Sequence, residues 1–315
     1  MSTNQPIITV TLNPAIDQTL SIPGFAAGKV NRVAKQESHA AGKGVNVAVV
    51  LADLGVNTIV TGWLGDQNQE LFKHLFASKR IDDRFIRVFG ETRVGIKISD
   101  DKTGDTTDIN FPGLTPSNDD LELLLNRIET LAKPNSWFAL CGSVPAGVSE
   151  DIYAKLIDRI AAGGGKVVLD TSGKPLHAAI ARGPAVAKPN VAELSELAGT
   201  ALNTAADVVN AARTHLLDHG VKLAVVSMGG DGAIFVNREQ AFLAKPPKVT
   251  VKSTVGAGDA MVAGLIYAQQ QGLSLEETAR VSSALGTHAV TKVGAGLESP
   301  TAHEQFMKGV TVQSV

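Results

Sequence analysis

The sequence has one cysteine, few aromatic residues and no long apolar run. Cys141 alone excludes an internal disulfide and any metal site built from several cysteines. It ends the apolar run WFAL and is expected to be a small buried residue. Aromatic residues make up 4% of the chain, which predicts a core of valine, alanine, leucine and isoleucine. That composition is typical of buried parallel strands.

The charge balance and the N-terminal segment bear on partners and location. The chain has 29 Lys and Arg against 31 Asp and Glu, with no basic run. It therefore lacks the electrostatic footprint of a protein that binds nucleic acid or an anionic membrane, and we expect a small-molecule partner. The opening MSTNQPIITV lacks a signal-peptide pattern, and no stretch approaches the ~18 apolar residues of a membrane span. We expect a cytoplasmic protein.

Short apolar runs alternate with helical patterns along the 315 residues, a length that suits two domains or one large α/β domain. We favour one domain, because alternation of buried strands with helices predicts a parallel sheet covered on both sides. Helices are also predicted at 257–272, 274–291 and 300–311. The predicted core strands are IITVTL (7–12), TIVTGWLG (58–65), WFALCG (137–142), KVVLD (166–170), PAVAKPN (184–190), LAVVS (223–227) and GAIFV (232–236).

Two stretches, 13–36 and 84–111, break this alternation. RFIRVFG, RVGIKIS and TTDINF alternate apolar with polar residues, and turn signals stand at Asp100-Asp101 and Gly104. We expect these stretches to form a small antiparallel sheet that projects from the core as a lid or a dimer surface. Ordinary edge strands are the alternative. With these two stretches as the lid, the core comprises residues 1–12, 37–83 and 112–315.

The segment STVGAGDAMVAG (253–264) runs from a glycine-rich turn directly into a helix. Gly256 and Gly258 leave backbone N–H groups uncovered, so this helix N-terminus can bind an anion. Asp259 lies in the first turn, where a carboxylate beside a bound phosphate can accept the proton of an attacking hydroxyl. A glycine turn followed by an acid that favours the helix dipole is the alternative.

Two familiar nucleotide-binding motifs do not fit the sequence. A dinucleotide fingerprint would need glycine where Met261 or Ser299 stands. A P-loop would need serine or threonine after its lysine, but glycine follows Lys43 and valine follows Lys166. Neither of the usual nucleotide folds is indicated.

Two further motifs contain groups suited to a phosphorylated polyol. AGKGVNVA (41–48) begins an amphipathic helix, where glycine-flanked Lys43 and Asn46 offer a cation and an amide. TLNPAID (11–17) places Asn13 and Asp17 after the first strand, where ligands bind in doubly wound sheets. A glycine-rich helix start and an Asn-Pro turn are the ordinary explanations.

Two motifs in the second half suit a nucleotide. In KPNVAEL (188–194), Asn190 precedes a helix and Glu193 stands at the reciprocal capping position. In SMGGDGA (227–233), glycines follow an apolar strand and would let a nucleotide approach the backbone. A capping box and a plain hairpin turn are the structural alternatives.

Together, AGKGVNVA, KPNVAEL, SMGGDGA and STVGAGDA resemble the ribokinase-like (PfkB) carbohydrate kinase family over nearly the whole chain. The resemblance implies a three-layer αβα core, a β-sheet lid that often forms a homodimer interface, and transfer of the γ-phosphoryl group of ATP, with Mg²⁺, to a sugar hydroxyl. TLNPAID, TRVGIK and KPPKVTVKSTVGAGD are most similar to bacterial members that phosphorylate the 6-hydroxyl of fructose 1-phosphate. The alternatives are a kinase of tagatose 6-phosphate or fructose 6-phosphate, and a non-catalytic sugar- or nucleotide-binding regulator.

The resemblance also implies roles for individual residues. Asp259 is the expected base, with an anion hole formed by Gly256, Ala257 and Gly258. Asn190 and Glu193 match the pair that organises Mg²⁺. The residues expected at the nucleotide are Lys188, Asn190, Ser227, Gly229, Gly232, Thr254, Gly286 and Thr287. The residues expected at the sugar phosphate are Asn13, Asp17, Lys29 (from a second subunit), Gly42, Lys43, Asn46, Arg93, Lys97 and Ser143. Two positions depart from the family pattern, namely Cys141 in CGSVPAG and Met228 in the nucleotide turn.

Overall fold

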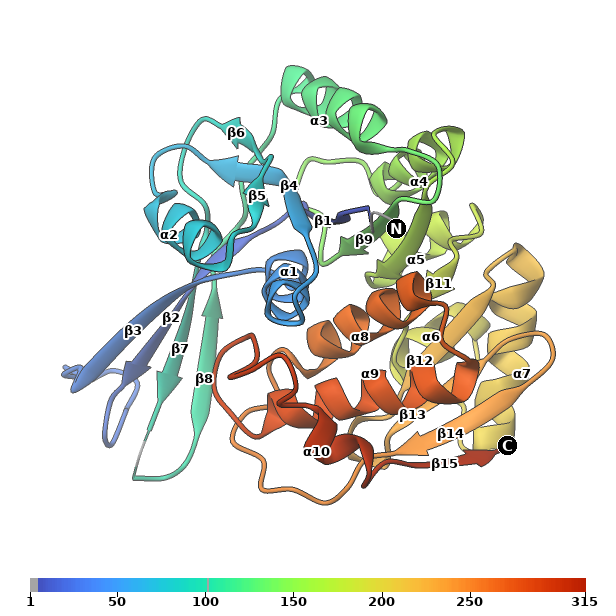
Figure 1. Cartoon of the computed structure of the whole chain (residues 1–315). Helices are drawn as coiled ribbons and strands as arrows, with labels where there is room; N and C mark the ends of the chain where they lie inside the picture. Colours follow the sequence, from blue (N-terminus) through green and yellow to red (C-terminus); the bar gives the residue numbers. More distant parts are fainter. Residues whose placement is uncertain (1–4, 101) are drawn as a thin grey trace.

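A large, mostly parallel sheet runs through the computed structural model, which describes residues 5–100 and 102–315 (Figure 1). Its order is β15-β14-β13-β12-β11-β10-β9-β1-β4-β5, and β6 pairs with β4. The strands from β5 to β12 are parallel, whereas β13, β14 and β15 are antiparallel. Their bounds are β1 Ile7–Thr11, β4 Thr58–Gly65, β5 Asp82–Asp83, β6 Ile86–Val88, β9 Trp137–Cys141, β10 Lys166–Asp170, β11 Val186–Ala187, β12 Leu223–Ser227, β13 Ala233–Val236, β14 Ala241–Lys245 and β15 Thr311–Ser314.

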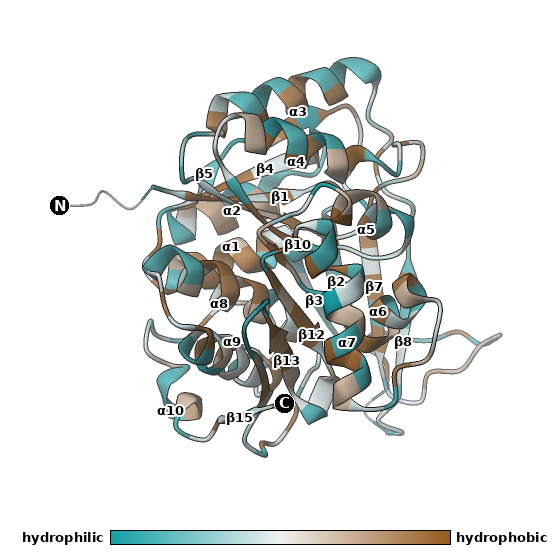
Figure 2. Cartoon of the chain, turned by 90° about the vertical axis from the view of Figure 1, so that its right-hand side faces the viewer, coloured by the Kyte–Doolittle hydropathy of each residue, from teal (hydrophilic) through white to brown (hydrophobic). Residues whose placement is uncertain are grey.

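Helices cover both faces of this sheet because its strands carry apolar residues on both sides. In β1, Ile8 and Val10 belong to the apolar cluster that includes side chains of α3 to α7, whereas Ile7 belongs to the cluster that includes side chains of α1, α8 and α9. Figure 2 shows the apolar strands enclosed between the helical layers. The helix bounds are α1 Lys43–Asp53, α2 Glu70–Lys79, α3 Asn118–Leu131, α4 Ile152–Ala162, α5 Gly173–Ile180, α6 Val191–Ala198, α7 Ala205–His215, α8 Ala257–Gln271, α9 Leu275–Val290 and α10 Glu304–Met307. The predicted three-layer α/β fold is confirmed.

A second sheet of four strands projects from the core, at the lower left of Figure 1. It consists of β2 (Ala15–Ser21), β3 (Lys35–Ala41), β7 (Val94–Ser99) and β8 (Thr106–Asn110), in the order β3-β2-β7-β8. The prediction of a purely antiparallel sheet is wrong at its centre, because β2 and β7 are parallel. The two come from distant parts of the chain, so no tight hairpin dictates their direction.

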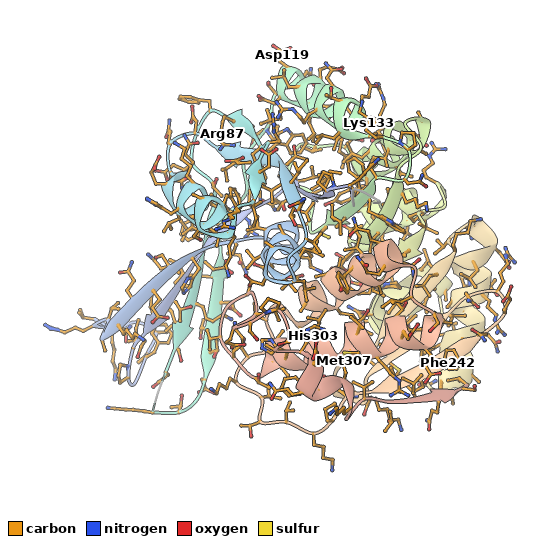
Figure 3. The ribbon with its side chains drawn as sticks, in the orientation of Figure 1. Arg87, Asp119, Lys133, Phe242, His303 and Met307 are labelled. Carbon is orange, nitrogen blue, oxygen red and sulfur yellow. The ribbon has the colours of Figure 1, made fainter. Side chains whose placement is uncertain are left out.

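Two other predictions about strands and helices are corrected. RFIRVFG does not join the small sheet, because Ile86 and Val88 are buried and β6 pairs with β4 of the core. The predicted helix 300–311 is reduced to the short α10, and the chain then forms β15 on the edge of β14. Figure 3 shows this end of the molecule, with His303 and Met307 at α10 and Asp119 at the opposite end on α3.

Two of our expectations fall partly on residues that the structure leaves undescribed. Residues 1–4, which we assigned to the core, and Asp101, part of a predicted turn, lie outside the described residues. Within residues 5–100 and 102–315, no helix is long and apolar enough to cross a membrane.

Candidate active site

The first turns of α1 and α8 meet near the carboxyl ends of the parallel strands. Asn46 on α1 donates a hydrogen bond from Nδ2 to Oδ2 of Asp259 on α8, over 2.7 Å. Gly256, the N-cap of α8, has a φ of 83°, a left-handed conformation that favours glycine. No side chain caps this helix, so its first N–H groups are available to an anion. The site thus combines a carboxylate with a helix start whose N–H groups no side chain caps.

Asp259 is buried, with only 7% of the residue exposed. Its pKa is raised from 3.8 to about 6, chiefly by burial and next by the negative charge of Asp170. The Asn46 hydrogen bond and the positive charges of Lys43 and Lys188 act in the opposite direction. The carboxyl group is therefore largely ionised at neutral pH and is poised close to the range where it can take up a proton.

Asp170, at the end of β10, connects two lysines of the site. Its buried carboxylate accepts a hydrogen bond from Lys43 Nζ at 3.0 Å and pairs with Lys188 Nζ at 3.1 Å. Burial alone would raise the pKa of Asp170, but Lys188 and Lys43 outweigh it and lower the pKa below its ordinary value. Burial would likewise lower the pKa of Lys43, but the carboxylates of Asp170 and Asp259 raise it.

Sequence reasoning missed Asp170, although a signal was present. The residue ends the predicted strand KVVLD, and an acid at the carboxyl end of a parallel strand lies at the ligand-binding edge of such a sheet. With Asp259, it balances the positive charges of Lys43 and Lys188, so the cluster has two carboxyl groups and two ammonium groups.

A chain of hydrogen bonds joins the small sheet to the core beside this cluster. Arg93 Nε donates to Asn13 Oδ1 at 3.1 Å, and Asn13 Nδ2 donates to Ser143 Oγ at 3.1 Å. Asp17 on β2 lies close to this chain: burial raises its pKa, and the charges of Arg93 and Lys97 lower it. Lys97 forms an ion pair of 2.9 Å with Asp108 on β8.

Two predicted sugar-side residues have different surroundings. Gly42 is the N-cap of α1, and that helix start also lacks a capping side chain. Lys29 lies in the loop between β2 and β3 and is exposed. The structure of this single chain does not bring Lys29 to the cluster around Asp259.

Asn190 and Glu193 form the predicted capping box at the start of α6. Glu193 N donates to Asn190 Oδ1, and Asn190 N donates to Glu193 Oε2, both at 2.8 Å. Capping uses one oxygen of each side chain. Lys188, two residues before Asn190, is buried, and its Nζ lies 3.6 Å from the position that a Cβ on Gly258 would occupy. The lysine therefore stands directly beside the start of α8.

The turn after β12 follows this capping box. Ser227 N donates to Pro189 O at 3.1 Å, and Met228 N donates to Gly232 O at 2.8 Å, which closes a tight turn over Gly229. An open pocket of about 430 Å³ lies beside it. The residues that line it include Asn190, Leu202, Thr204, Ser227, Met228 and Asp231, of which sequence reasoning missed Leu202, Thr204 and Asp231.

The C-terminal part of α9 packs against the start of α8. A Cβ on Gly286 would lie 3.4 Å from the carbonyl oxygen of Ala257, so glycine permits this approach. Thr287 is buried, and its hydroxyl donates to Ser283 O at 2.7 Å. Thr254 stands in the turn that leads into α8. These three residues surround the helix start from the α9 side, and their part in nucleotide binding stays a prediction.

Comparison with known proteins identifies the family of the chain. Residues 6–302 match the family model described as pfkB family carbohydrate kinase. The chain is 46% identical to a 1-phosphofructokinase of Rhodobacter capsulatus and 38% identical to one of Escherichia coli strain K12, with 98% of each chain covered in both comparisons.

Solved structures show the same fold. A possible 1-phosphofructokinase of Thermotoga maritima superposes with a TM-score of 0.86 at 29% identity, over 99% of this chain and 100% of that chain. Phosphofructokinase-2 of Escherichia coli in complex with fructose-6-phosphate superposes with a TM-score of 0.90 at 27% identity, over 97% and 99% of the two chains.

Proposed function

Because the chain belongs to the pfkB family of carbohydrate kinases, we propose that it transfers the γ-phosphoryl group of ATP to the 6-hydroxyl of fructose 1-phosphate. The products are fructose 1,6-bisphosphate and ADP. The structural observation that carries this proposal is the buried carboxylate of Asp259 beside the uncapped start of α8. Relatives named 1-phosphofructokinase, at 36% to 46% identity, support fructose 1-phosphate as the acceptor.

In this reaction Asp259 would accept the proton of the sugar hydroxyl as that oxygen attacks the γ-phosphorus. Phosphoryl transfer passes through a loose transition state, so positioning and charge stabilisation matter more than strong activation of the nucleophile. Asn46 would hold the carboxylate in place, and the N–H groups of the anion hole would stabilise charge on the transferred group.

The sugar phosphate would bind between α1 and the small sheet. Lys43, Arg93 and Lys97 are the cations that would hold the 1-phosphate. Asp17 and Asn46 would bind ring hydroxyls, and Asn13 and Ser143 are already joined to Arg93 by hydrogen bonds. This arrangement would direct the 6-hydroxyl toward Asp259.

ATP would approach from the side of Ser227, Gly229, Gly232 and Thr254, with Lys188 near its phosphates. Mg²⁺ bound to ATP would neutralise phosphate charge during transfer. Within the described part of the chain, no cluster of three or more metal-ligating side chains is present. This fits Mg²⁺, which commonly binds through one or two carboxylates, water and substrate phosphates. Glu193 commits Oε2 to capping and keeps Oε1, and Asn190 Oδ1 keeps its second lone pair, so both would orient the ion through water.

We also propose that the small sheet of β2, β3, β7 and β8 is a lid and the surface of a homodimer. It extends beyond the expected stretches 13–36 and 84–111, because β3 continues to Ala41. Every residue of the edge strand β8 is exposed, including apolar Ile109, and exposed Phe111 follows it directly. Val30 and Val33, in the loop between β2 and β3, also expose apolar side chains. Exposed apolar residues on an edge strand are a typical protein interface. Lys29 would then reach the sugar phosphate of the other subunit, and the enzyme would act in the cytoplasm.

Release of ADP tests the proposal, with Mg-ATP and fructose 1-phosphate, fructose 6-phosphate or tagatose 6-phosphate in parallel. We expect fructose 1-phosphate to lead in kcat/KM by at least about tenfold, equivalent to ~1.4 kcal/mol of transition-state discrimination. If another sugar phosphate leads, the roles of Lys43 and Arg93 are wrong. If none is turned over, a binding regulator replaces the kinase.

A further inference from the structure

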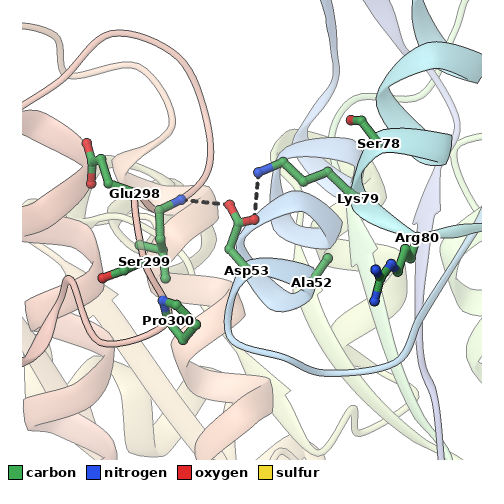
Figure 4. A pocket seen from close by; sticks show the side chains of 9 residues that line it. Ala52, Asp53, Ser78, Lys79, Arg80, Glu298, Ser299 and Pro300 are labelled. Carbon is green, nitrogen blue, oxygen red and sulfur yellow. Dashed lines mark hydrogen bonds and ion pairs between the residues drawn. The ribbon is translucent and has the colours of Figure 1, made fainter.

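Asp53, the last residue of α1, joins three segments that are distant in sequence. Its Oδ1 accepts from Lys79 Nζ of α2 at 2.6 Å, and its Oδ2 accepts from the backbone N–H of Leu297 at 2.8 Å. Figure 4 shows Asp53 between Lys79 and the C-terminal segment. The Asp53 side chain is only 12% exposed, whereas Lys79 is 31% exposed, so the carboxylate is the better shielded member of the ion pair.

The segment 292–298, which follows α9, packs closely on α1 at this point. Gly296 has a φ of 100°, and a Cβ there would lie 2.6 Å from Asp53 Oδ2 and 3.0 Å from Val49 Cγ1. Leu297 is buried in the apolar cluster that α1 shares with α8 and α9. A side chain at position 296 would push the segment away from α1, so glycine is required here.

The same segment is tied to the end of α9. His288 Nε2 lies 2.5 Å from Glu298 Oε2, and Lys292 Nζ donates to Gly296 O at 3.1 Å. Two residues after His288, the carbonyl oxygen of Val290 accepts from Lys252 N at 2.8 Å and from Ser253 N at 3.3 Å. Residues 252 and 253 lead directly into the anion hole. A continuous path of contacts therefore runs from Asp53 to the start of α8.

The groove of about 410 Å³ beside Asp53 is better explained as the surface of a contact between segments than as a ligand site. Its charged groups are of both signs, and Lys79 is already paired with Asp53. Glu298 adds a second carboxylate and is bonded to His288. Asp53 and Lys79 are thus engaged with each other, and Glu298 with the end of α9, which is the pattern of an anchor between segments.

We propose that Asp53 is a positioning residue, which holds segment 292–298 against α1 and thereby fixes the anion hole at the start of α8. The inference rests on the proposed kinase function. Loss of the anchor should affect the 292–298 side rather than α1, because α1 is held by Val47, Val50 and Leu51, all buried in the core. Segment 292–298 has fewer apolar anchors, since Val293 is exposed and Leu297 is its buried apolar residue.

The test compares Asp53→Ala with Asp53→Asn and a matched control. In Asp53→Asn the side-chain amide oxygen can still accept from Leu297 N, so this variant loses the ion pair but keeps the anchor. Asp83→Ala is the control, because Asp83 also pairs with a basic side chain, Arg87, and accepts from a backbone N–H, that of Phe85. Figure 3 shows Arg87 well away from α9 and from His303.

Two measurements are made on each variant: KM and kcat for both substrates, and amide hydrogen exchange. For Asp53→Ala we expect faster amide exchange in 292–298 and in 252–258. The KM for ATP should rise by about three- to thirty-fold, whereas the KM for the sugar phosphate should stay within about twofold of wild type. In Asp53→Asn, the exchange rates of both segments and the KM for ATP should stay near their wild-type values. Asp83→Ala should lower the melting temperature but should change neither the exchange in 292–298 and 252–258 nor the KM for ATP.

Several outcomes would overturn the proposal. One is faster exchange in 292–298 alone, with 252–258 and the ATP KM unchanged, which would make Asp53 only a local anchor. Another is an equal rise in both KM values, or the same kinetics in Asp83→Ala. A wild-type protein that is inactive on every sugar phosphate would refute the proposed function. Amide exchange does not depend on turnover, so it would still show whether Asp53 holds segment 292–298 and residues 252–258 in place.

Discussion

Asn46 and Asp259 are joined by a 2.7 Å hydrogen bond, although 213 residues separate them in the chain. The bond brings the start of α1, with the proposed sugar-phosphate ligand Lys43, to the first turn of α8, with the anion hole. It therefore connects the two halves of the proposed reaction at the carboxyl group that would accept the proton. Its consequences for rate and for pH dependence can be tested separately.

Replacing the proposed base should lower the rate without preventing ATP binding. We expect Asp259→Asn to reduce kcat by roughly 10²- to 10⁴-fold, the usual contribution of a general base, because an amide cannot accept the proton. Single-turnover kinetics and the Kd for ATP separate the two effects. Asp207→Asn is a suitable control, because Asp207 occupies the equivalent first-turn position of α7. A kcat of Asp259→Asn within twofold of wild type would remove Asp259 from the mechanism.

The pH dependence of the wild-type enzyme should report Asp259. Since its pKa is raised to about 6 by burial, kcat/KM should fall as the pH is lowered through that value, because protonated Asp259 cannot act as a base. In Asn46→Ala the lost hydrogen bond no longer favours the ionised form, so the acid limb should move to higher pH. The profile is measured from about pH 5 to 9. An acid limb that does not move would point to ionisation of the sugar phosphate itself, whose second pKa is near ~6.

Much of this site could be predicted from the sequence because its motifs are local. A glycine turn that enters a helix predicts an anion-binding helix start, and Asp259 follows within one turn. The capping box of Asn190 and Glu193 could also be predicted, since its two residues are three positions apart. Buried strands such as IITVT and KVVLD have continuous apolar runs, so their predicted bounds agree closely with those of β1 and β10 in the structure.

Other features depend on contacts between distant parts of the chain. The pairing of Asp170 with Lys43 spans 127 residues and follows only from the order of the strands in the sheet. β6 joined the core because its apolar residues are buried against β4, which an alternating pattern alone does not show. β15 formed because the edge of β14 was available for pairing. In each case tertiary structure decided between locally acceptable alternatives.

Asp170 should contribute to stability as well as to the arrangement of the lysines. Asp170→Asn leaves buried Lys188 without a carboxylate, and we expect unfolding in urea to become easier by roughly 3 to 5 kcal/mol at pH 7. The pKa of Asp170 is lowered by Lys188 and Lys43, so its contribution is present above the unfolded pKa near 3.8 and is lost as pH falls through the lower folded value. The deficit of the variant should therefore shrink only below about pH 4.

A control separates this effect from loss of any carboxylate. Asp158 forms an exposed ion pair with Arg182, so Asp158→Asn should cost at most about 1 kcal/mol. If Asp170→Asn is no more destabilising than Asp158→Asn, the buried cluster contributes no stability.

Lys43 should act on one substrate. We expect Lys43→Met, which keeps the apolar stem, to raise the sugar-phosphate KM by roughly ten- to a hundred-fold through loss of a charged hydrogen bond, with the ATP KM within about threefold. Lys174→Met, at an exposed lysine paired with Glu150, is the control. Equal increases in both KM values would contradict the assignment of Lys43 to the sugar phosphate.

Lys29 allows a test of the dimer in solution, because the single chain does not bring it to the cluster around Asp259, while the proposal places it at the partner's site. Lys29→Ala should raise the sugar-phosphate KM, and Asp259→Asn should have the low kcat predicted above. If Lys29 acts across the interface, a mixed dimer contains one complete site, formed by Asp259 of the first variant and Lys29 of the second. Random exchange gives about half mixed dimers, so about a quarter of all sites should recover wild-type kinetics at low sugar phosphate. Recovery fails if Lys29 serves its own subunit, and it also fails if the protein is a monomer, which light scattering detects. The two measurements together decide whether the small sheet completes the active site of a second chain.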